Sequence, residues 1–384
     1  MTEINEIEKT YRRLRTEGRD ILRLFSGNPN DAGIFFPGKI LEDIYSRYFQ
    51  QQHYHPHPKG LPEARRAIAN YYASQDAVVD PEHIIVTSGT SESFLNIFTL
   101  LTKPGDNILT SRPSYPLFDH IAELARIELK PYRLDEGKNW AIDLPNLRRQ
   151  TDDRTKAIVL ISPHNPTGAV ATPEEIREMV DWANQKNIAI ICDEVFSEFY
   201  FGEGVYPRMM IAKPKLGFTL NGISKMFALP ALKLGWIAVT GDKILVEDAV
   251  DRLETTNDTF LSCHTPIQLA LPELFEKGAE FLAHYRAVVR QRRDLAVSLI
   301  ENMTGVDWVA PRGGFYLMAR VTPPLLQQEE AFVIRLMKEK GVFVHPGHFY
   351  EHNCGTHWVA CYLAPPEQMR QGLRAIGELL SAVP

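Results

Sequence analysis

Residues 156–194 read KAIVLISPHNPTGAVATPEEIREMVDWANQKNIAIICDE, and the architecture can be worked out from this stretch. Apolar runs at 157–161 and 188–192 flank a segment at 173–186 whose apolar residues recur at helical spacing. The two runs are continuous rather than alternating, which is typical of strands that are buried on both faces. A strand, a helix and a second such strand in this order predict two parallel strands joined by a helix.

The same alternation extends on both sides of this stretch. Further short apolar runs adjoin helical segments: HIIVTS (83–88), DNILTS (106–111), GFTLNGIS (217–224) and GWIAVTG (235–241). We therefore expect an α/β protein with a mostly parallel sheet wrapped by helices, in a large domain that spans residues 52–283. The C-terminal part changes to GGFYLMARV (313–321), VFVHPG (342–347) and HWVACYL (357–363), separated by helices. Residues 1–51 and 284–384 are expected to form a smaller α+β domain.

Composition limits the classes of function. The 384 residues include 42 Lys+Arg and 48 Asp+Glu, a net charge of −6, and 44% are hydrophobic. This is enough apolar material for a large core, and a mildly acidic chain without a Lys/Arg run argues against nucleic acid or a membrane as partner. No apolar stretch reaches the ~20 residues of a membrane helix and the start is too polar for a signal peptide, so we expect a cytoplasmic protein.

Metal and disulfide sites are not expected from the sequence. The four cysteines are scattered without a CxxC pair, which predicts neither a disulfide framework nor a zinc site. The histidines at 53–57 lack acidic residues at the spacing of metal ligands.

The ends of the predicted strands provide the candidates for a site, because ligands of open α/β sheets bind beyond the carboxyl ends of the strands. These ends carry TSGTS (87–91), SPHNPTG (162–168), Asp193 with Glu194, and Ser224 with Lys225. Small residues at a strand-to-helix turn can bind an anion through the helix N-terminus, although they also fit a plain N-cap. The segment 165–168 likewise fits an ordinary turn.

Asp193 and Lys225 carry a stronger chemical signal. A carboxylate that ends a buried apolar strand is costly to desolvate without a partner. A lysine at a strand end among small residues could be desolvated, which lowers its pKa and provides the amine that a Schiff base needs. A solvated lysine is the alternative interpretation.

Taken in order, these motifs resemble the aspartate aminotransferase superfamily, the fold-type-I pyridoxal-phosphate enzymes, and within it the class I and II aminotransferases. The resemblance covers nearly the whole chain. Its motifs are SGNP (26–29), GIFFP (33–37), YHPHPKGL (54–61), TSGTSES (87–93), PSYP (113–116), NPTG (165–168), DEVF (193–196), SK (224–225), PRGGF (311–315) and PG (346–347).

The resemblance implies a fold-type-I architecture, bound pyridoxal 5'-phosphate and a role for each matching residue. Lys225 would form the Schiff base with the cofactor and then move the α-proton as general acid and base. Asp193 would pair with the pyridine nitrogen, Asn165 would donate to the phenolic oxygen, and Tyr115 would stack on the ring. Tyr54 would reach the phosphate in the neighbouring subunit, which implies a homodimer. The implied catalytic residues are Lys225, Asp193 and Tyr115, and the implied cofactor-binding residues are Gly89, Thr90, Ser91, Tyr115, Asn165, Asp193, Ser224, Lys225, Lys233 and Tyr54.

Four positions depart from the family pattern. Gly222 replaces a hydroxyl residue that binds the phosphate, and Lys233 replaces an arginine that binds it. Phe196 replaces a tyrosine that donates to the phenolic oxygen. Aligning HWVACYL with the family puts Ala360 where an arginine clamps the substrate α-carboxylate, and loss of that partner would cost on the order of several kcal/mol.

Three explanations for the missing clamp remain open. Another cation could bind the carboxylate, and the candidates are Arg112, Arg312, Arg320, His53, His55 and His345. The substrate could lack a free α-carboxylate. The protein could instead run another pyridoxal-phosphate reaction, such as β-elimination or decarboxylation.

We predict a pyridoxal-phosphate-dependent aminotransferase that moves an amino group between a small-molecule donor and an oxo acceptor by a ping-pong mechanism. Its substrate is expected to be atypical because of Ala360. A ligand-sensing domain of a transcription regulator is the competing class, but the sequence has no helix-turn-helix pattern and no basic patch. A non-catalytic homologue is a further alternative, against which the retention of Lys225, Asp193, Asn165 and Tyr115 argues.

Overall fold

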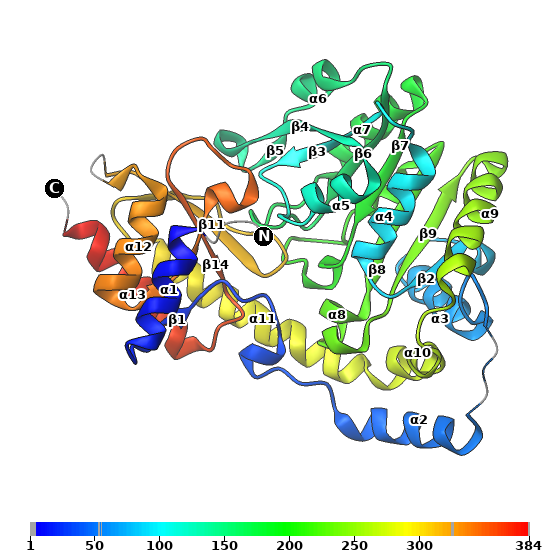
Figure 1. The fold of residues 1–384 in the computed structure, drawn as a ribbon, viewed down its shortest axis with the longest axis horizontal. Helices are drawn as coiled ribbons and strands as arrows, with labels where there is room; N and C mark the ends of the chain where they lie inside the picture. Colours follow the sequence, from blue (N-terminus) through cyan, green and yellow to red (C-terminus); the bar gives the residue numbers. More distant parts are fainter. Residues whose placement is uncertain (1–4, 53, 55, 324–325, 383–384) are drawn as a thin grey trace.

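The computed structural model describes residues 5–52, 54, 56–323 and 326–382. These residues form an eight-stranded sheet, a four-stranded sheet and a short two-stranded sheet, with helices packed around them (Figure 1). The order of strands in the large sheet is β2-β9-β8-β7-β6-β3-β4-β5. Their bounds are β2 (Ile84–Thr87), β3 (Asn107–Arg112), β4 (Glu128–Asp135), β5 (Ala141–Ile142), β6 (Thr155–Ile161), β7 (Ala189–Asp193), β8 (Leu216–Gly222) and β9 (Gly235–Gly241).

The large sheet is mostly parallel, as the sequence predicted. Strands β8, β7, β6, β3 and β4 run parallel to one another. Strand β9 is antiparallel to both β2 and β8, and β5 is antiparallel to β4. The parallel strands share one edge at which all their carboxyl ends meet.

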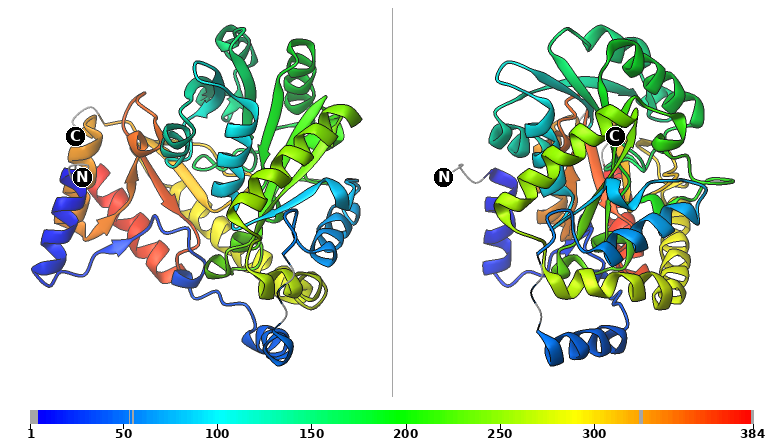
Figure 2. Two further views of the ribbon diagram at one scale, coloured as in Figure 1. Left: turned by 45° about the vertical axis from the view of Figure 1, so that its right-hand side comes forward. Right: turned by 90° about the vertical axis from the view of Figure 1, so that its right-hand side faces the viewer.

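Helices cover both faces of this sheet (Figure 2). One face packs against α4 (Thr90–Leu101), α5 (Phe118–Ala125) and α9 (Lys243–Phe260). The other face packs against α6 (Leu144–Gln150) and α7 (Pro173–Lys186), and near β2 and β9 against α3 (Pro62–Ala73) and α10 (Thr265–Lys277). Apolar side chains on both faces explain why the strands appear in the sequence as continuous apolar runs.

Residues at both ends of α7 set the bounds of this helix, which lies in the segment 156–194. Thr172 accepts from the main-chain N–H of Glu175, the Glu175 side chain accepts in return from the Thr172 N–H, and Pro173 occupies the first turn. Asn187 ends the helix in the left-handed conformation with φ 54°.

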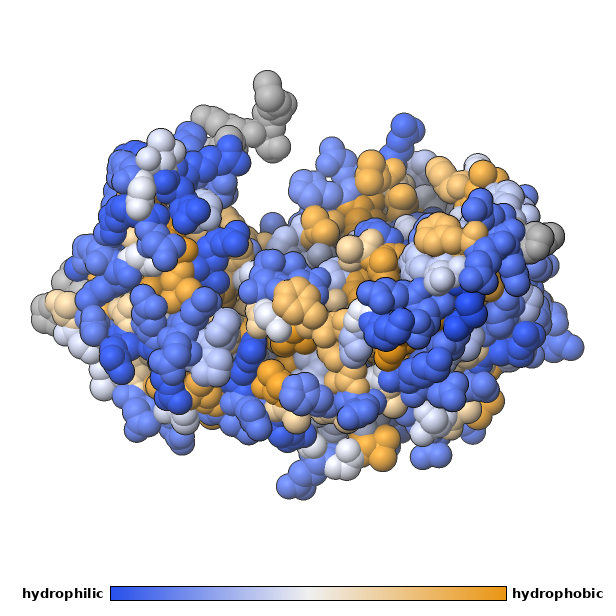
Figure 3. All heavy atoms as spheres, turned by 90° about the horizontal axis from the view of Figure 1, so that it is seen from below, coloured by the Kyte–Doolittle hydropathy of each residue, from blue (hydrophilic) through white to orange (hydrophobic). Residues whose placement is uncertain are grey.

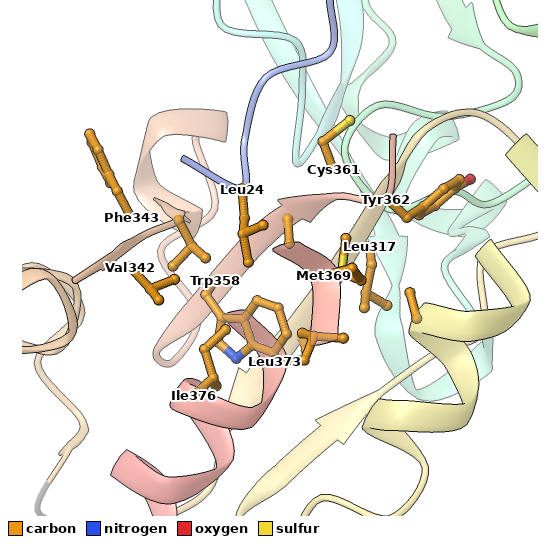
Figure 4. Close-up of a cluster of buried hydrophobic side chains, with 14 of the residues drawn as sticks. Leu24, Leu317, Val342, Phe343, Trp358, Cys361, Tyr362, Met369, Leu373 and Ile376 are labelled. Carbon is orange, nitrogen blue, oxygen red and sulfur yellow. The ribbon is translucent and has the colours of Figure 1, made fainter. Parts of the chain in front are cut away.

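The C-terminal part forms the four-stranded antiparallel sheet, ordered β10-β11-β14-β13. Its strands are β10 (Val306–Trp308), β11 (Tyr316–Val321), β13 (His345–Pro346) and β14 (His357–Cys361), while β1 (Leu22–Arg23) pairs with β12 (Val342–Phe343). Surrounding helices are α1 (Glu6–Thr16), α11 (Ala279–Ile300), α12 (Glu329–Lys340) and α13 (Pro366–Ser381). Figure 4 shows Leu317 and Trp358 from this sheet packed with Met369, Leu373 and Ile376 of α13.

The division into domains at residues 51/52 and 283/284 stays a prediction. Helix α2 (Gly38–Gln51) lies at the edge of the molecule below α10 (Figures 1 and 2), and its buried Ile44 packs in one cluster with Ile267 and Leu271. This helix therefore packs on the side of the large sheet.

The remaining short helices are α8 (Ile223–Met226), η1 (Asn30–Ala32), η2 (Pro81–His83), η3 (Glu136–Lys138), η4 (Ser197–Phe199), η5 (Met209–Ala212), η6 (Pro230–Leu232) and η8 (Gly347–Tyr350). Within the described ranges, no helix combines the length and the apolar character that crossing a bilayer requires.

Candidate active site

The carboxyl ends of β6, β7 and β8 bring three of the predicted residues to one edge of the sheet. Asp193 ends β7 and pairs in register with Ile161 of β6 and Leu220 of β8. Asn165 follows β6 by a few residues, and Lys225 lies on α8 directly after β8. Parallel order thus places an amide, a carboxylate and an amine at the position where open α/β sheets bind ligands.

Lys225 is held under the N-terminal loop. Its Nζ donates to the carbonyl oxygen of Gly27 at 2.7 Å and lies 6.0 Å from the ring centroid of Phe196. The loop is fixed in turn by Asn30, whose Nδ2 donates to the carbonyl of Ala228 at 3.1 Å. Burial lowers the pKa of Lys225, which favours the neutral amine that a nucleophile requires.

Asp193 is buried, and its Oδ1 accepts from the main-chain N–H of Val195 at 3.0 Å. Burial raises the pKa of Asp193 to about 7, the N–H of Val195 opposes this rise, and the nearby charge of Glu194 adds to it. Burial, and then the nearby charge of Asp193, raise the pKa of Tyr115, so the phenol lies close to this carboxylate. A cationic ring nitrogen is the type of partner that would stabilise the Asp193 charge.

Asn165 has bonding capacity that the described residues leave unused. The residue is buried, and its Oδ1 atom has no hydrogen-bond partner among them. Buried amide groups are almost always hydrogen-bonded, so an unpaired amide oxygen here indicates that a ligand or an ordered water binds to it.

An anion site lies at the start of α4. Gly89 precedes the helix with φ 148°, and Thr90 and Ser91 form its first turn. The Lys233 Nζ lies 3.9 Å from the position that a Cβ on Gly89 would occupy. The free N–H groups of a helix N-terminus and an ammonium group beside them are suited to bind a phosphate.

The departure at Gly222 has a steric reason. A Cβ on Gly222 would lie 2.8 Å from the carbonyl oxygen of Leu234, so a hydroxyl residue does not fit without a shift of the main chain. A Cβ on Gly235 would likewise lie 2.9 Å from the Cα of Gly89. The main chain at the end of β8 therefore approaches the start of β9, and the start of β9 approaches the residue that precedes α4.

Phe196 and Ser224 lie near Lys225, whereas Tyr54 lies at the surface of the chain. Phe196 is buried, packs edge-on against Phe315 with ring centroids 4.8 Å apart, and offers no hydroxyl group. Ser224 is partly buried beside Lys225. Tyr54 is 61% exposed, so within one chain it does not form part of the buried site.

These residues fit pyridoxal phosphate as a group. The anion site suits its phosphate, Asp193 suits its ring nitrogen, the Nδ2 group of Asn165 is the donor that suits its phenolic oxygen, and Lys225 suits its aldehyde. We infer this fit to pyridoxal phosphate from the polar groups of the site that still have hydrogen-bonding capacity.

The register of β14 shows on which face Ala360 lies, while its alignment with the carboxylate-binding arginine of the family stays a prediction. Ala360 pairs with Leu317, while Cys361 pairs with Tyr316. A Cβ on Gly27 would lie 2.0 Å from the Tyr316 hydroxyl, so Tyr316 faces the loop that holds Lys225. Because side chains alternate along a strand, Cys361 shares that face and Ala360 points to the opposite face with its register partner Leu317. Both Ala360 and Cys361 are buried. An aligned arginine at position 360 would point away from Lys225.

Figure 4 shows Cys361 directed away from the group that Leu317 forms with Met369 and Leu373. Burial raises the pKa of Cys361 to about 12, and the nearby Lys225 opposes this shift. The side of β14 that faces Lys225 thus carries Cys361 and, two residues earlier, Val359. The strand still offers no arginine to the site.

The proposed substitutes for the arginine lie elsewhere, with one exception. Arg112 pairs with Asp119 (Nη2–Oδ1 3.4 Å), and Arg320 pairs with Asp307 (Nη2–Oδ2 2.6 Å). Arg312 lines a separate cavity of about 400 Å³ beside Trp140. His53 and His55 lie outside the described residues.

His345 is the exception, because it stacks on Phe25 (ring centroids 4.1 Å apart) close to the loop of Gly27. Its Nδ1 lies 3.1 Å from the Tyr350 hydroxyl. Burial lowers the pKa of His345 to about 4, so at neutral pH it is an uncharged hydrogen-bonding group.

Sequence reasoning missed the wall opposite the sheet edge. Burial raises the pKa of Tyr316, and Cys361, Tyr350 and Tyr115 raise it further, so these groups surround the Tyr316 hydroxyl. Gly27 lies in the SGNP motif that the sequence singled out, but the contact of its carbonyl with Lys225 has no sequence signal. Tyr316 and Tyr350 come from the C-terminal part, where no motif marks them.

Comparison with known proteins agrees with this geometry. The family model for aminotransferases of class I and II matches residues 19–376. The glutamate-pyruvate aminotransferase AlaA of Haemophilus influenzae is 28% identical over 382 residues, which cover 98% of this chain and 94% of the relative. AlaA of Escherichia coli is 31% identical over 318 residues, which cover 82% and 78% of the two chains.

Solved structures share the fold. An aminotransferase from Escherichia coli superposes with a TM-score of 0.88 at 27% identity and covers 99% of this chain and 95% of its own. Alanine aminotransferase from Pyrococcus furiosus superposes with a TM-score of 0.92 at 24% identity and covers 98% and 96%. With the family model matching nearly the whole chain, this protein belongs to the class I and II aminotransferases, which are pyridoxal-phosphate-dependent enzymes.

Proposed function

We propose that this aminotransferase moves an amino group between a donor amine and an oxo acceptor by a ping-pong mechanism, and that one substrate is bound without an arginine–carboxylate pair. The observation that carries the proposal is the neutral face of β14, where Val359 and Cys361 lie on the side of Lys225. Tyr316 and Tyr350 line the same space with hydroxyl groups. A substrate whose amino-bearing carbon carries no carboxylate matches such a surface.

The residues of this chain divide the work of the reaction. Bound pyridoxal phosphate supplies an electron sink for the bond that breaks at the substrate carbon. Lys225, with its pKa lowered by burial, accepts a proton from that carbon and returns it to the adjacent position. Asp193 becomes a stable carboxylate when a protonated ring nitrogen faces it. Gly89, Thr90 and Lys233, at the start of α4, would hold the phosphate.

A second candidate substrate class is favoured by Arg292 of α11. Its Nη1 donates to the carbonyls of Ala32 (3.2 Å) and Leu363, and it has no carboxylate partner among the described residues. Burial raises the pKa of Cys361 and the charge of Arg292 opposes that rise, so Arg292 lies near the β14 face. An α-amino acid whose carboxylate reached Arg292 would be an ordinary aminotransferase substrate, as the names of the glutamate-pyruvate relatives suggest.

A titration of the visible absorption of the purified enzyme separates the two classes. Carboxylate-free amines and α-amino acids such as glutamate and alanine are added in turn, and an Arg292→Gln variant is measured in parallel. A response to amines alone, unchanged in Arg292→Gln, supports the first class. A response to α-amino acids that Arg292→Gln loses replaces it with the second.

Product analysis tests the reaction type. Transamination requires an oxo acceptor in each cycle and yields one aminated product per oxo product. Turnover of an amine without any acceptor, with release of ammonia or carbon dioxide, would instead indicate β-elimination or decarboxylation. No turnover with any amine, by a protein that binds the cofactor, would indicate a non-catalytic homologue.

We further propose that the protein works as a homodimer in which Tyr54 reaches the neighbouring site. Exposed apolar side chains near α2 support a covered face: Phe49 is 60% exposed, Phe260 77% and Leu261 63%. Ser262 donates to the carbonyl of His57 at 2.9 Å, which places this segment beside the loop of Tyr54. Figure 3 views the side of the molecule that carries α2, where apolar residues lie among polar ones. Each of the four cysteines is a free thiol, which suits the cytoplasmic location that we propose.

A further inference from the structure

Three potential metal ligands meet between the two larger sheets. Glu136 begins η3, directly after β4 of the large sheet, whereas His352 follows η8 and His357 begins β14 of the small sheet. One ligand atom from each lies within 4.8 Å of the other two. The Nε2 of His357 lies 3.2 Å from Oε1 of Glu136, and the two imidazole rings stand perpendicular with centroids 4.4 Å apart. In Figure 1 the loop between β13 and β14 extends toward the part of the large sheet that carries β4 and β5.

The histidines have unused bonding capacity in a buried place. The side chain of His357 is fully buried, and its Nδ1 has no hydrogen-bond partner among the described residues. The Nε2 of His352 is a buried atom that also lacks one. A buried polar atom without a partner is unfavourable because it loses its solvation. An ion in the cluster would provide the missing partner of the His352 Nε2, and the second nitrogen ligand would be the His357 Nε2 that already faces Glu136.

The charged side chains next to these three residues already have partners of their own. Glu329 accepts from Nδ1 of His348 at 2.6 Å and from the main-chain N–H of His357 at 2.8 Å, which fixes the start of β14. Arg320 lies 3.9 Å from Glu136 through its Nε, but its Nη2 is bonded to Asp307 at 2.6 Å. The cluster of three is therefore not consumed by a stronger ion pair.

Trp140 encloses the cluster on one side. Its ring centroid lies 5.5 Å from that of His352 and 6.3 Å from that of His357, both edge-on. An apolar wall of this kind limits the access of water to a bound ion.

From this arrangement we propose that Glu136, His352 and His357 form a binding site for a zinc-like transition-metal dication. Two imidazole nitrogens and one carboxylate oxygen are a ligand set that Zn²⁺ accepts, with bonds of about 2.0–2.2 Å and a water in the fourth position. Such bonds at tetrahedral angles put ligand atoms roughly 3.4 Å apart. The His357–Glu136 pair already matches this spacing, and closure around the ion draws in His352.

The ion would join the two larger sheets rather than take part in the chemistry at Lys225. His357 lies four residues before Cys361 on β14, which corresponds to about 13 Å along the strand. Because Glu136 comes from one sheet unit and the histidines from the other, binding would hold the units together.

The test uses the cofactor-loaded full chain without an affinity tag, freed of metal by a chelator and titrated with ZnCl₂ by calorimetry. We expect one Zn²⁺ per chain, a melting temperature that rises with Zn²⁺, and no response to Mg²⁺, which prefers oxygen ligands. His352→Ala and Glu136→Gln should each weaken Zn²⁺ binding by about a hundredfold and abolish the rise in melting temperature. His352 is only partly buried, so its variant is expected to fold, and circular dichroism verifies this.

Two variants serve as matched controls. Cys354→Ser removes an exposed thiol from the same loop, and His284→Ala removes an exposed histidine from α11. Both should bind Zn²⁺ as the parent does. Absence of Zn²⁺ binding by the parent, or binding that persists in folded His352→Ala and Glu136→Gln, would overturn the site and leave at most adventitious surface binding.

Discussion

Burial shifts the pKa values of Lys225 and Asp193 in opposite directions. It lowers that of the amine and raises that of the carboxyl group to about 7, so both groups are driven toward their neutral forms without the cofactor. The site is thus prepared for a group that reacts with an amine and brings a positive charge to Asp193. The energetic cost of both burials is offset only when that group is bound.

Removal of the Lys225 amine should abolish turnover. Lys225→Ala leaves no nucleophile and no proton carrier at the sheet edge, and general acid–base catalysis alone is worth about 10²–10⁴-fold. We expect kcat to fall by at least about a thousandfold, and the absorption band of the bound cofactor to shift to that of the free aldehyde. The Lys225→Arg variant keeps a positive charge at this position and is therefore the control for loss of charge alone. Full activity in Lys225→Ala would disprove the assignment.

The Asp193 carboxyl group should make the cofactor-free protein less stable as pH rises. Its pKa is 3.8 in an unfolded chain and about 7 when folded, so the folded state binds the proton more tightly between these values. The free energy of unfolding therefore falls from about pH 4 to pH 7, by at most roughly 4 kcal/mol.

Urea unfolding at pH 5 and pH 8 measures this effect. Asp193→Asn should remove most of the fall, and addition of pyridoxal phosphate should reduce it in the parent protein. An identical pH dependence in the parent and in Asp193→Asn would show that the carboxyl group does not carry the shift.

Several of these residues could be predicted because they follow apolar runs directly. Asp193, Asn165 and Lys225 stand at strand ends, where parallel topology dictates their proximity. The unpaired atoms of His352 and His357 had no comparable signal, since their partner Glu136 lies more than two hundred residues away. Contacts at that separation depend on how the two sheets pack.

At the scale of elements, β14 forms where the sequence predicted a strand, but the face on which each of its residues lies was not predicted. The run HWVACYL predicted the strand, and β14 forms there over His357–Cys361. A shift of one residue exchanges the two faces of a strand, and family alignment did not fix the face of Ala360. The pairing of Ala360 with Leu317 and of Cys361 with Tyr316 fixes the face of each residue.

Arginine substitutions along β14 test this assignment of faces. Ala360→Arg would place a charge among apolar residues of the core, and an unpaired buried charge costs about 3–5 kcal/mol. Cys361→Arg, the matched variant on the opposite face, would place the guanidinium beside Lys225 and should raise kcat/KM for α-amino acids relative to amines. Thermal melts and steady-state rates measure both. A stable Ala360→Arg enzyme with improved use of α-amino acids would reverse the assignment.

Strands β4 and β5 mark the limit of prediction from apolar runs. β4 reads ELKPYRLD, and only Tyr132 of its residues is buried. It lies near the sheet edge, where one side chain in the core is sufficient and polar residues elsewhere are tolerated. Its partner β5 has two residues, too few for any pattern. Central strands were recognisable because burial on both faces restricts their composition.

At the scale of the whole molecule, the proposed role of Tyr54 depends on a second chain. Tyr54 is 61% exposed and follows α2, which projects at the edge of the molecule (Figure 1). The exposed Phe49 and Leu261 lie on neighbouring segments. A dimer formed through this face would cover these side chains and bring Tyr54 to the second chain.

Mixed dimers can distinguish a Tyr54 that acts across the interface from one that acts within its own chain. Lys225→Ala and Tyr54→Ala are each expected to be impaired alone, the second through weaker binding of the cofactor phosphate. In a mixed dimer with action across the interface, one site combines the intact Lys225 of one chain with the intact Tyr54 of the other. Random reassociation makes half of the dimers mixed, so about a quarter of the parent activity should return at limiting cofactor. Action within the chain repairs no site, and mixing would then yield only the sum of the two separate activities.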